Sequence, residues 1–204
     1  MESPLSLLTR ALLPVIILLA AACAPKAPPG AAAAAPPRPP VILISVDGLR
    51  ADYLQRGITP NIAALASGGV TTPAMRPSFP SLTFPNHYTL VTGLRPDRHG
   101  IVNNNMEDPD IPGVRFSLGN RAAVEDRRWW DDAEPIWVTA ERAGLKTATM
   151  FWPGSEAAVR GVRPSRWMPF DGKLPNPARI AQVLAWLDEP QRPAFLTLYF
   201  DTVD

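Results

Sequence analysis

The sequence predicts an α/β fold built around a mostly parallel sheet. Strand-like and helix-like segments alternate between residues 41 and 200, the order expected of strands joined by crossover helices. The strand-like runs are continuously apolar, which is typical of parallel strands buried on both faces. Two helix-like segments open on Thr59-Pro60 and Asn176-Pro177, a capping residue followed by the proline that a first helical turn tolerates.

The first strand is predicted over "VILISVDG", residues 41–48, with both faces buried. Asp47 would then lie at the C-terminal edge of the sheet. The next segment, "TPNIAALASGG", predicts a helix with Thr59 as its N-cap and Gly68 or Gly69 at its end. The domain therefore opens with a strand followed by a helix.

Further elements are predicted in the second half of the chain. "PIWVTAERAGLKTATMFW" predicts a helix ended by Gly144 and a strand near residues 147–151. "NPARIAQVLAWLDE" predicts a helix with Asn176 as its cap, and a last strand is expected over residues 194–200. This helix has one apolar face at the spacing i, i+3, i+4, i+7, formed by Ile180, Val183, Leu184 and Leu187. The polar stretch over residues 103–134 is expected to be a long functional loop.

Residues 1–23 are typical of an export signal, because an apolar run too short to span a membrane follows a single arginine and ends in small residues. Cys23 is the only cysteine and resembles the lipidated residue of a bacterial lipoprotein box, with Ala20 where a leucine is usual. The alternative is ordinary signal cleavage, which would discard Cys23. We expect an exported protein that is periplasmic or anchored to a bacterial outer membrane.

Residues 24–40 form a Pro/Ala tract, typical of an extended linker that would hold a domain away from a membrane. We expect residues 41–204 to be the incomplete, N-terminal portion of a domain. The last strand lies close to Asp204, and no later element would cover it. The net charge of +1 gives no sign of a nucleic-acid-binding surface.

Two acidic residues are predicted at one edge of the sheet. Asp47 follows the first strand and Asp204 follows the last. Ligands of open α/β sheets bind beyond the carboxyl ends of the strands. Two carboxylates there would suit a hard or borderline cation, whereas each one alone is consistent with an acid that caps a turn.

The segment "SLTFPNHYTLVTG" predicts a short helix, with Pro85 in its first turn and Gly93 at its end. Thr83 would lie at or just before the N-terminus, where free N–H groups favour a phosphate or a developing alkoxide. A simple N-cap is the alternative for Thr83. His87 would share its helical face, either as a general base or as a structural histidine.

Four segments, "ISVDGLRADYL", "TPNIAALASGGV", "SFPSLTFPNHYTLVTGLRPDRHGIVNNN" and "FWPGSE", occur in this order. Together they resemble the nucleotide pyrophosphatase/phosphodiesterase family of the alkaline phosphatase superfamily. The resemblance covers residues 41–204 and implies an alkaline-phosphatase-like α/β/α sandwich with two zinc ions at the sheet edge. It also implies zinc-dependent hydrolysis of nucleotide phosphodiester or pyrophosphate bonds through a phosphothreonine, with release of a nucleoside monophosphate.

The resemblance assigns roles to individual residues. It implies that Thr83 is the nucleophile, that Asp47 binds the zinc ion that activates Thr83, and that Asp204 binds the other zinc ion. It implies that Asn104 donates to a phosphoryl oxygen. The remaining histidine and aspartate ligands of the family have no counterpart in this chain, so we expect these residues by themselves to be inactive.

The resemblance also implies a nucleotide base pocket lined by Phe84, Trp152 and Tyr199. Trp167 stands where relatives often carry a pocket tyrosine, while His87 and His99 are implied to be structural. A phosphate monoesterase or a phospholipid-type phosphodiesterase on the same core is an alternative, as is an inactive truncated surface lipoprotein. A sulfatase is disfavoured, because its modified Cys or Ser context is absent.

Overall fold

The computed structural model describes residues 39–204. The predicted export signal, Cys23 and the linker up to residue 38 lie outside the described residues. Within the described part, no helix combines the length and the apolar character needed to cross a membrane.

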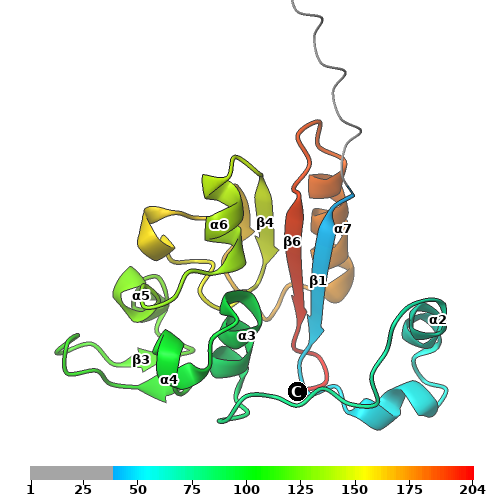
Figure 1. Cartoon of the computed structure of the whole chain (residues 1–204), viewed down its shortest axis with the longest axis horizontal. Helices are drawn as coiled ribbons and strands as arrows, with labels where there is room; N and C mark the ends of the chain where they lie inside the picture. The colour runs from blue at the N-terminus through cyan, green and yellow to red at the C-terminus, as the bar shows by residue number, and fades with distance from the viewer. Residues whose placement is uncertain (1–38) are drawn as a thin grey trace, which may run out of the picture. The chain divides into compact units, whose positions relative to one another are not determined.

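The centre of the structure is a four-stranded sheet in which every neighbouring pair is parallel (Figure 1). Its strands, in spatial order, are β1 (Val41–Val46), β6 (Phe195–Phe200), β4 (Thr147–Met150) and β5 (Arg166–Met168). A separate antiparallel pair is formed by β2 (Asn105–Met106) and β3 (Phe116–Ser117). This arrangement confirms the expected α/β class with a mostly parallel sheet.

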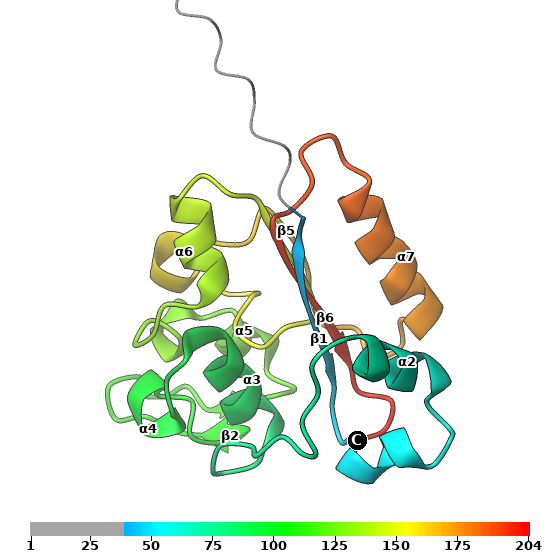
Figure 2. The ribbon, with the colours of Figure 1, turned by 45° about the vertical axis from the view of Figure 1, so that its right-hand side comes forward.

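Helices lie on both sides of the sheet, with α7 on one side and α3 and α6 on the other (Figure 2). The helices, including short 3-10 turns marked η, are η1 (Ala51–Gln55), α2 (Pro60–Gly68), α3 (Thr83–Thr92), α4 (Pro96–His99), α5 (Arg121–Val124), η2 (Arg127–Trp129), α6 (Ile136–Arg142), η3 (Val159–Gly161) and α7 (Asn176–Leu187). The layered arrangement follows from strands that are joined by crossover helices.

Most of the predicted helix ends are confirmed. Thr59 is the N-cap of α2 and Gly69 its C-cap, and Gly144 has a left-handed φ of 78° just after α6, a conformation that glycine adopts without steric cost. The prediction for Asn176 was wrong, because Pro175 is the N-cap of α7 and Asn176 is its first residue. The side-chain amide of Asn176 donates to the hydroxyl of Thr202 instead of capping the helix.

The prediction that the first strand is buried on both faces was wrong. Among the described strands, β1 pairs only with β6, and the side chains of Val41, Ile42 and Ile44 are exposed. β6, which lies between β1 and β4, is buried on both faces, and so is β4, which lies between β6 and β5. An apolar, β-branched run suits either position, and long-range pairing decides which strand lies in the centre.

The predicted apolar face of α7 is also only partly correct. Val183 packs into the core, but Ile180 and Leu184 are exposed. The buried residues of the helix are Arg179, Val183 and Trp186. Arg179 can face the core because its guanidinium donates to the carbonyl oxygens of Leu174 and Tyr199 and to the carboxylate of Asp201, which compensates for the loss of water.

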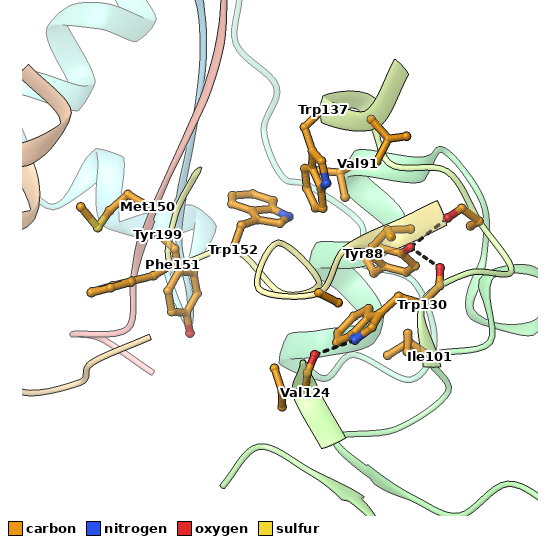
Figure 3. Packing of buried hydrophobic residues seen from close by; sticks show 14 of the residues in the cluster. Tyr88, Val91, Ile101, Val124, Trp130, Trp137, Met150, Phe151, Trp152 and Tyr199 are labelled. Atoms are coloured by element: carbon orange, nitrogen blue, oxygen red, sulfur yellow. Dashed lines mark hydrogen bonds between the residues drawn. The ribbon is translucent and has the colours of Figure 1, made fainter. Parts of the chain in front are cut away.

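Residues 103–134 are not one long loop, because they contain the β2–β3 pair, α5 and η2. Trp129 and Trp130 at their end are buried in the aromatic core, and Figure 3 shows Trp130 there. The hydroxyl of Tyr88, on α3, donates to the carbonyl oxygens of Trp130 and Ala133, and the Trp130 indole donates to Val124. These buried bonds hold α3 against the rest of the domain.

Candidate active site

Thr83 is the first residue of α3, and Leu82 is the N-cap in an extended conformation. The Thr83 hydroxyl donates to Oδ2 of Asp47 at 3.0 Å. The alternative in which Thr83 is a simple N-cap is wrong, since Leu82 occupies the N-cap position and Thr83 lies inside the helix. The helix instead presents the hydroxyl to the carboxylate that follows β1.

Asn104 lies beside the same helix N-terminus. Its Oδ1 accepts a hydrogen bond from the backbone N–H of Phe84 at 2.9 Å, so it satisfies one of the free donors of the first turn. An N–H group cannot donate to an amide nitrogen, and this contact therefore fixes the orientation of the side chain. The Nδ2 group of Asn104 remains the donor on the other side.

Asp47 joins several parts of the site. Its Oδ2 accepts hydrogen bonds from both the Thr83 hydroxyl and the Tyr199 hydroxyl, each at 3.0 Å, and its Oδ1 accepts from the N–H of Gly48. Burial, together with the nearby Asp47 carboxylate, raises the pKa of Tyr199 well above its ordinary value. Tyr199 therefore keeps its proton and acts as a donor to Asp47.

The turn after β1 lies against the residues that follow β6. Gly48 has a φ of 71°, and a Cβ built there would lie 2.6 Å from the carbonyl oxygen of Val203 and 2.7 Å from Cα of Asp204. Only glycine fits this approach. The fold thereby brings Asp47 and Asp204 to the same edge of the sheet, as predicted.

His87 lies one turn after Thr83 and is buried. Its Nδ1 is 2.7 Å from the carbonyl oxygen of Thr83, so Nδ1 carries the proton and donates. Its Nε2 then accepts from the hydroxyl of Ser45 at 2.8 Å. Burial lowers the pKa of His87 and keeps the ring neutral. Both nitrogens are occupied by structural contacts, so the ring does not act as a base toward Thr83.

His99, on α4, is fully buried as well. Its Nε2 lies 3.0 Å from the hydroxyl of Thr89, and its Nδ1 accepts from the N–H of Ile101. This histidine connects α3 to the segment after α4, in agreement with the structural role that the sequence implied.

A cleft of about 230 Å³ opens beside Thr83. Phe84, Trp152 and Tyr199 all line it, as expected for a base pocket, and Asp204 lies on its margin. Trp152 is only 1% exposed, and its indole N–H donates to the carbonyl oxygen of His87, so it contributes the floor of the cleft and little open surface. Figure 3 shows Trp152 and Tyr199 among the packed side chains of the core.

Several wall residues were missed from the sequence, among them Leu118 and Phe170, which are both about half exposed. Trp167 is not among the residues that line this cleft. Its ring packs under the guanidinium of Arg163 at 5.1 Å, so the residue expected at the position of the relatives' pocket tyrosine lies away from this cleft. Phe170 lies three positions further along, in an irregular segment whose path the local sequence does not predict.

The described residues supply only part of a metal site. Asp47, Asp204 and Thr83 offer oxygen atoms of the kind that zinc accepts, but no group of three or more His, Cys, Asp or Glu residues converges within residues 39–204. The residues present therefore do not by themselves form the two-zinc centre that the resemblance implies.

Comparison with known proteins decides the family. The sequence model of type I phosphodiesterases/nucleotide pyrophosphatases matches residues 41–204. The chain belongs to this family. Residues 41–204 correspond to the N-terminal part of the family's catalytic domain.

Two curated relatives illustrate the sequence similarity. An uncharacterised pyrophosphatase/phosphodiesterase of Schizosaccharomyces pombe is 48% identical over 166 residues, which cover 80% of this chain and 34% of the relative. Ectonucleotide pyrophosphatase/phosphodiesterase family member 1 of Homo sapiens is 44% identical over 167 residues, covering 80% of this chain and 18% of the relative. The chain thus spans about a third or less of the length of these relatives.

Two solved structures show the same fold. An inactive threonine-to-alanine variant of murine ectonucleotide pyrophosphatase/phosphodiesterase 5, in complex with AMP, is 33% identical with a TM-score of 0.76. The match covers 81% of this chain and 44% of that one. The human enzyme of the same name is 35% identical with a TM-score of 0.75, covering 80% of this chain and 43% of that one. This likeness confirms the alkaline-phosphatase-like fold.

Proposed function

We propose that this protein hydrolyses phosphodiester and pyrophosphate bonds of nucleotides in a zinc-dependent reaction. Thr83 would form a phosphothreonine intermediate, and the product would be a nucleoside monophosphate. The observation that carries the proposal is the convergence of Thr83, Asp47 and Asn104 at the N-terminus of α3, in a chain that belongs to the phosphodiesterase family.

The local geometry suits an attack by Thr83 on phosphorus. Asp47 orients the hydroxyl through a 3.0 Å hydrogen bond. The first turn of α3 and the Nδ2 group of Asn104 offer N–H donors for the negative charge of a phosphoryl group. A threonine hydroxyl is a weak nucleophile at neutral pH, and zinc, when bound with the help of Asp47, Thr83 and Asp204, would supply the charge that lowers its pKa.

A nucleotide substrate is supported by the cleft and by one relative. Five aromatic residues are among those that line the cleft beside Thr83, and aromatic rings can stack on a base. Murine ectonucleotide pyrophosphatase/phosphodiesterase 5 was solved with AMP in an inactive threonine-to-alanine variant. We infer a corresponding nucleoside monophosphate site here, with the phosphate next to Thr83.

The test uses the protein expressed from its complete reading frame and supplied with Zn²⁺. We expect it to cleave bis-p-nitrophenyl phosphate, and we expect Thr83→Ala to lower kcat by about 10³-fold or more, as for other lost nucleophiles. Thr92→Ala is the matched control, since Thr92 ends the same helix and its hydroxyl bonds only to backbone groups at that end, donating to the carbonyl oxygen of Tyr88 and accepting from the N–H of Leu94. Undiminished turnover in Thr83→Ala would refute the proposal.

The same protein distinguishes the alternatives. A faster rate on p-nitrophenyl phosphate than on the diester would favour a phosphate monoesterase, and release of a lipid head group would favour a phospholipid-type phosphodiesterase. A reading frame that stops directly after Asp204 would favour an inactive surface lipoprotein.

We also propose that the protein is exported and anchored through a lipid on Cys23. Metabolic labelling with a fatty acid should mark the unmodified protein and not Cys23→Ser. Equal labelling of both, or of neither, would contradict the lipid anchor.

A further inference from the structure

A buried carboxylate connects α5 to the wall of the cleft. Glu156, in the segment after β4, is 7% exposed. Its Oε1 accepts from the backbone N–H of Phe170 at 3.0 Å, and its Oε2 accepts from Nη1 of Arg121 at 2.9 Å. Nη2 of Arg121 also lies 3.4 Å from the carbonyl oxygen of Phe170 as a donor. Both backbone groups of Phe170 are therefore held by one ion pair.

Phe170 is a wall of the cleft whose position depends on its backbone. Its ring is 45% exposed and makes edge contacts with Phe151 at 5.4 Å and Tyr199 at 6.3 Å. It lies between β5 and α7, outside regular secondary structure, so no strand or helix ladder fixes its N–H and C=O groups. The hydrogen bonds to Glu156 and Arg121 take over that function.

We propose that Arg121 is a positioning residue that, through Glu156, holds Phe170 as the base-facing wall of the cleft. Arg121 would thereby set the affinity for substrates that carry a nucleobase, without a part in phosphoryl transfer. The proposal rests on the proposed function for the identity of the ligand. Arg121 does not line the cleft next to Thr83, whereas Glu156 and Phe170 both do, so its influence on a bound base would pass through these two residues.

The Arg121–Glu156 ion pair contributes to stability mainly because Glu156 is buried. The Arg121 side chain is half exposed, and an ion pair between two exposed groups contributes little. Glu156 is almost fully buried, however, and removal of its cation leaves a carboxylate with poor access to water. The result would be a shift of Glu156 toward solvent, and Phe170 would move with it because its N–H is bonded to the same carboxylate.

Arg121 has a second acidic partner that supplies a matched control. Nη1 of Arg121 donates to Glu125 at 3.1 Å, one helical turn along α5. This pair is exposed, and Glu125 itself has no hydrogen bond to Phe170 or Glu156 among the described residues. Glu125→Gln removes an ion pair of Arg121 and leaves the link to Glu156 and Phe170 in place.

The kinetic test compares substrates with and without a base in the zinc-supplied protein from the complete reading frame. For the p-nitrophenyl ester of thymidine 5′-monophosphate, Arg121→Met should raise KM about five- to tenfold with kcat changed less than about twofold. For methyl p-nitrophenyl phosphate, which has no base, both constants should stay within about twofold. Arg121→Lys should recover part of the loss, and Glu125→Gln should behave like the unmodified protein. Equal losses on both substrates, or no loss on either, would overturn the proposal.

A second measurement keeps the proposal testable if the protein has no diesterase activity. Hydrogen exchange of the Phe170 amide, followed by mass spectrometry on the peptide that spans residues 166–172, should be at least about fivefold faster in Arg121→Met than in Glu125→Gln. Equal exchange rates would refute the positioning role whatever the enzyme does. Faster exchange in a protein that cleaves neither substrate would support the positioning role and refute the proposed function.

Discussion

From the contact between Asn104 and the N-terminus of α3, we predict that substitutions of Asn104 change the stability and the activity of the protein independently. Asn104 uses Oδ1 to accept from the Phe84 N–H, and its Nδ2 remains as a donor toward the phosphate. Asn104→Ala removes both functions. Asn104→Asp keeps an acceptor for the Phe84 N–H but replaces the donor with a second negatively charged oxygen.

The magnitudes follow from these two roles. Loss of the capping acceptor in Asn104→Ala should lower the free energy of unfolding by about 1 kcal/mol. In Asn104→Asp the acceptor is retained, and a negative charge at a helix N-terminus adds roughly 0.5 kcal/mol of stability, so the free energy of unfolding should be unchanged or slightly higher. Both variants should lose about 10²- to 10³-fold in kcat, as expected when a donor to a developing oxyanion is removed.

Urea unfolding at neutral pH and diesterase kinetics with Zn²⁺ measure the two quantities. Asn105→Ala is the control, because Asn105 directly follows Asn104 in the chain and its side chain is exposed. If Asn104→Asp were destabilised as much as Asn104→Ala, the capping role would be wrong. If Asn104→Asp kept more than about a tenth of the activity, the donor role would be wrong.

Two further predictions concern the sheet edge and the sheet periphery. Gly48→Ala should be destabilised by at least about 1 kcal/mol more than Gly57→Ala and should bind zinc about tenfold more weakly. Both glycines have a left-handed φ, but only a Cβ at Gly48 would meet the backbone of Val203 and Asp204. Equal stability and equal metal affinity of the two variants would show that this contact does not position Asp204. Burial raises the pKa of Glu141, but hydrogen bonds from Thr147 and Ser165 outweigh it and hold the pKa below its ordinary value of 4.5. The ionised Glu141 carboxylate therefore stabilises the fold at any pH above its ordinary pKa, and this stabilisation is lost as the pH falls through the lowered pKa. Glu141→Gln should reduce the free energy of unfolding by about 1–2 kcal/mol at pH 7 and by progressively less on acidification. A reduction that does not change with pH would contradict this account.

The sequence by itself determined the class of fold and much of the site. Proline and glycine act locally, so the start of α2 at Pro60 and the end of α3 at Gly93 could be predicted from their neighbours alone. Strand-like apolar runs that are followed by an acid placed Asp47 and Asp204 at one edge. The family-like segments identified Thr83 and Asn104, and the structure brings both to the N-terminus of α3.

The tertiary structure decided features that depend on contacts between distant segments. The apolar run of β1 could not show that this strand lies at an edge, because the order of strands follows from pairing with β6, far along the chain. The spacing of α7 could not show that Arg179 faces the core, since that rotation requires acceptors from Tyr199 and Asp201. Phe170 reaches the cleft only because Glu156 and Arg121 hold its backbone. The spacing of residues along the chain predicts which side chains share a face of a helix or strand. Which of those faces is buried, and which polar groups find hydrogen-bond partners, depends on the distant segments that pack against them.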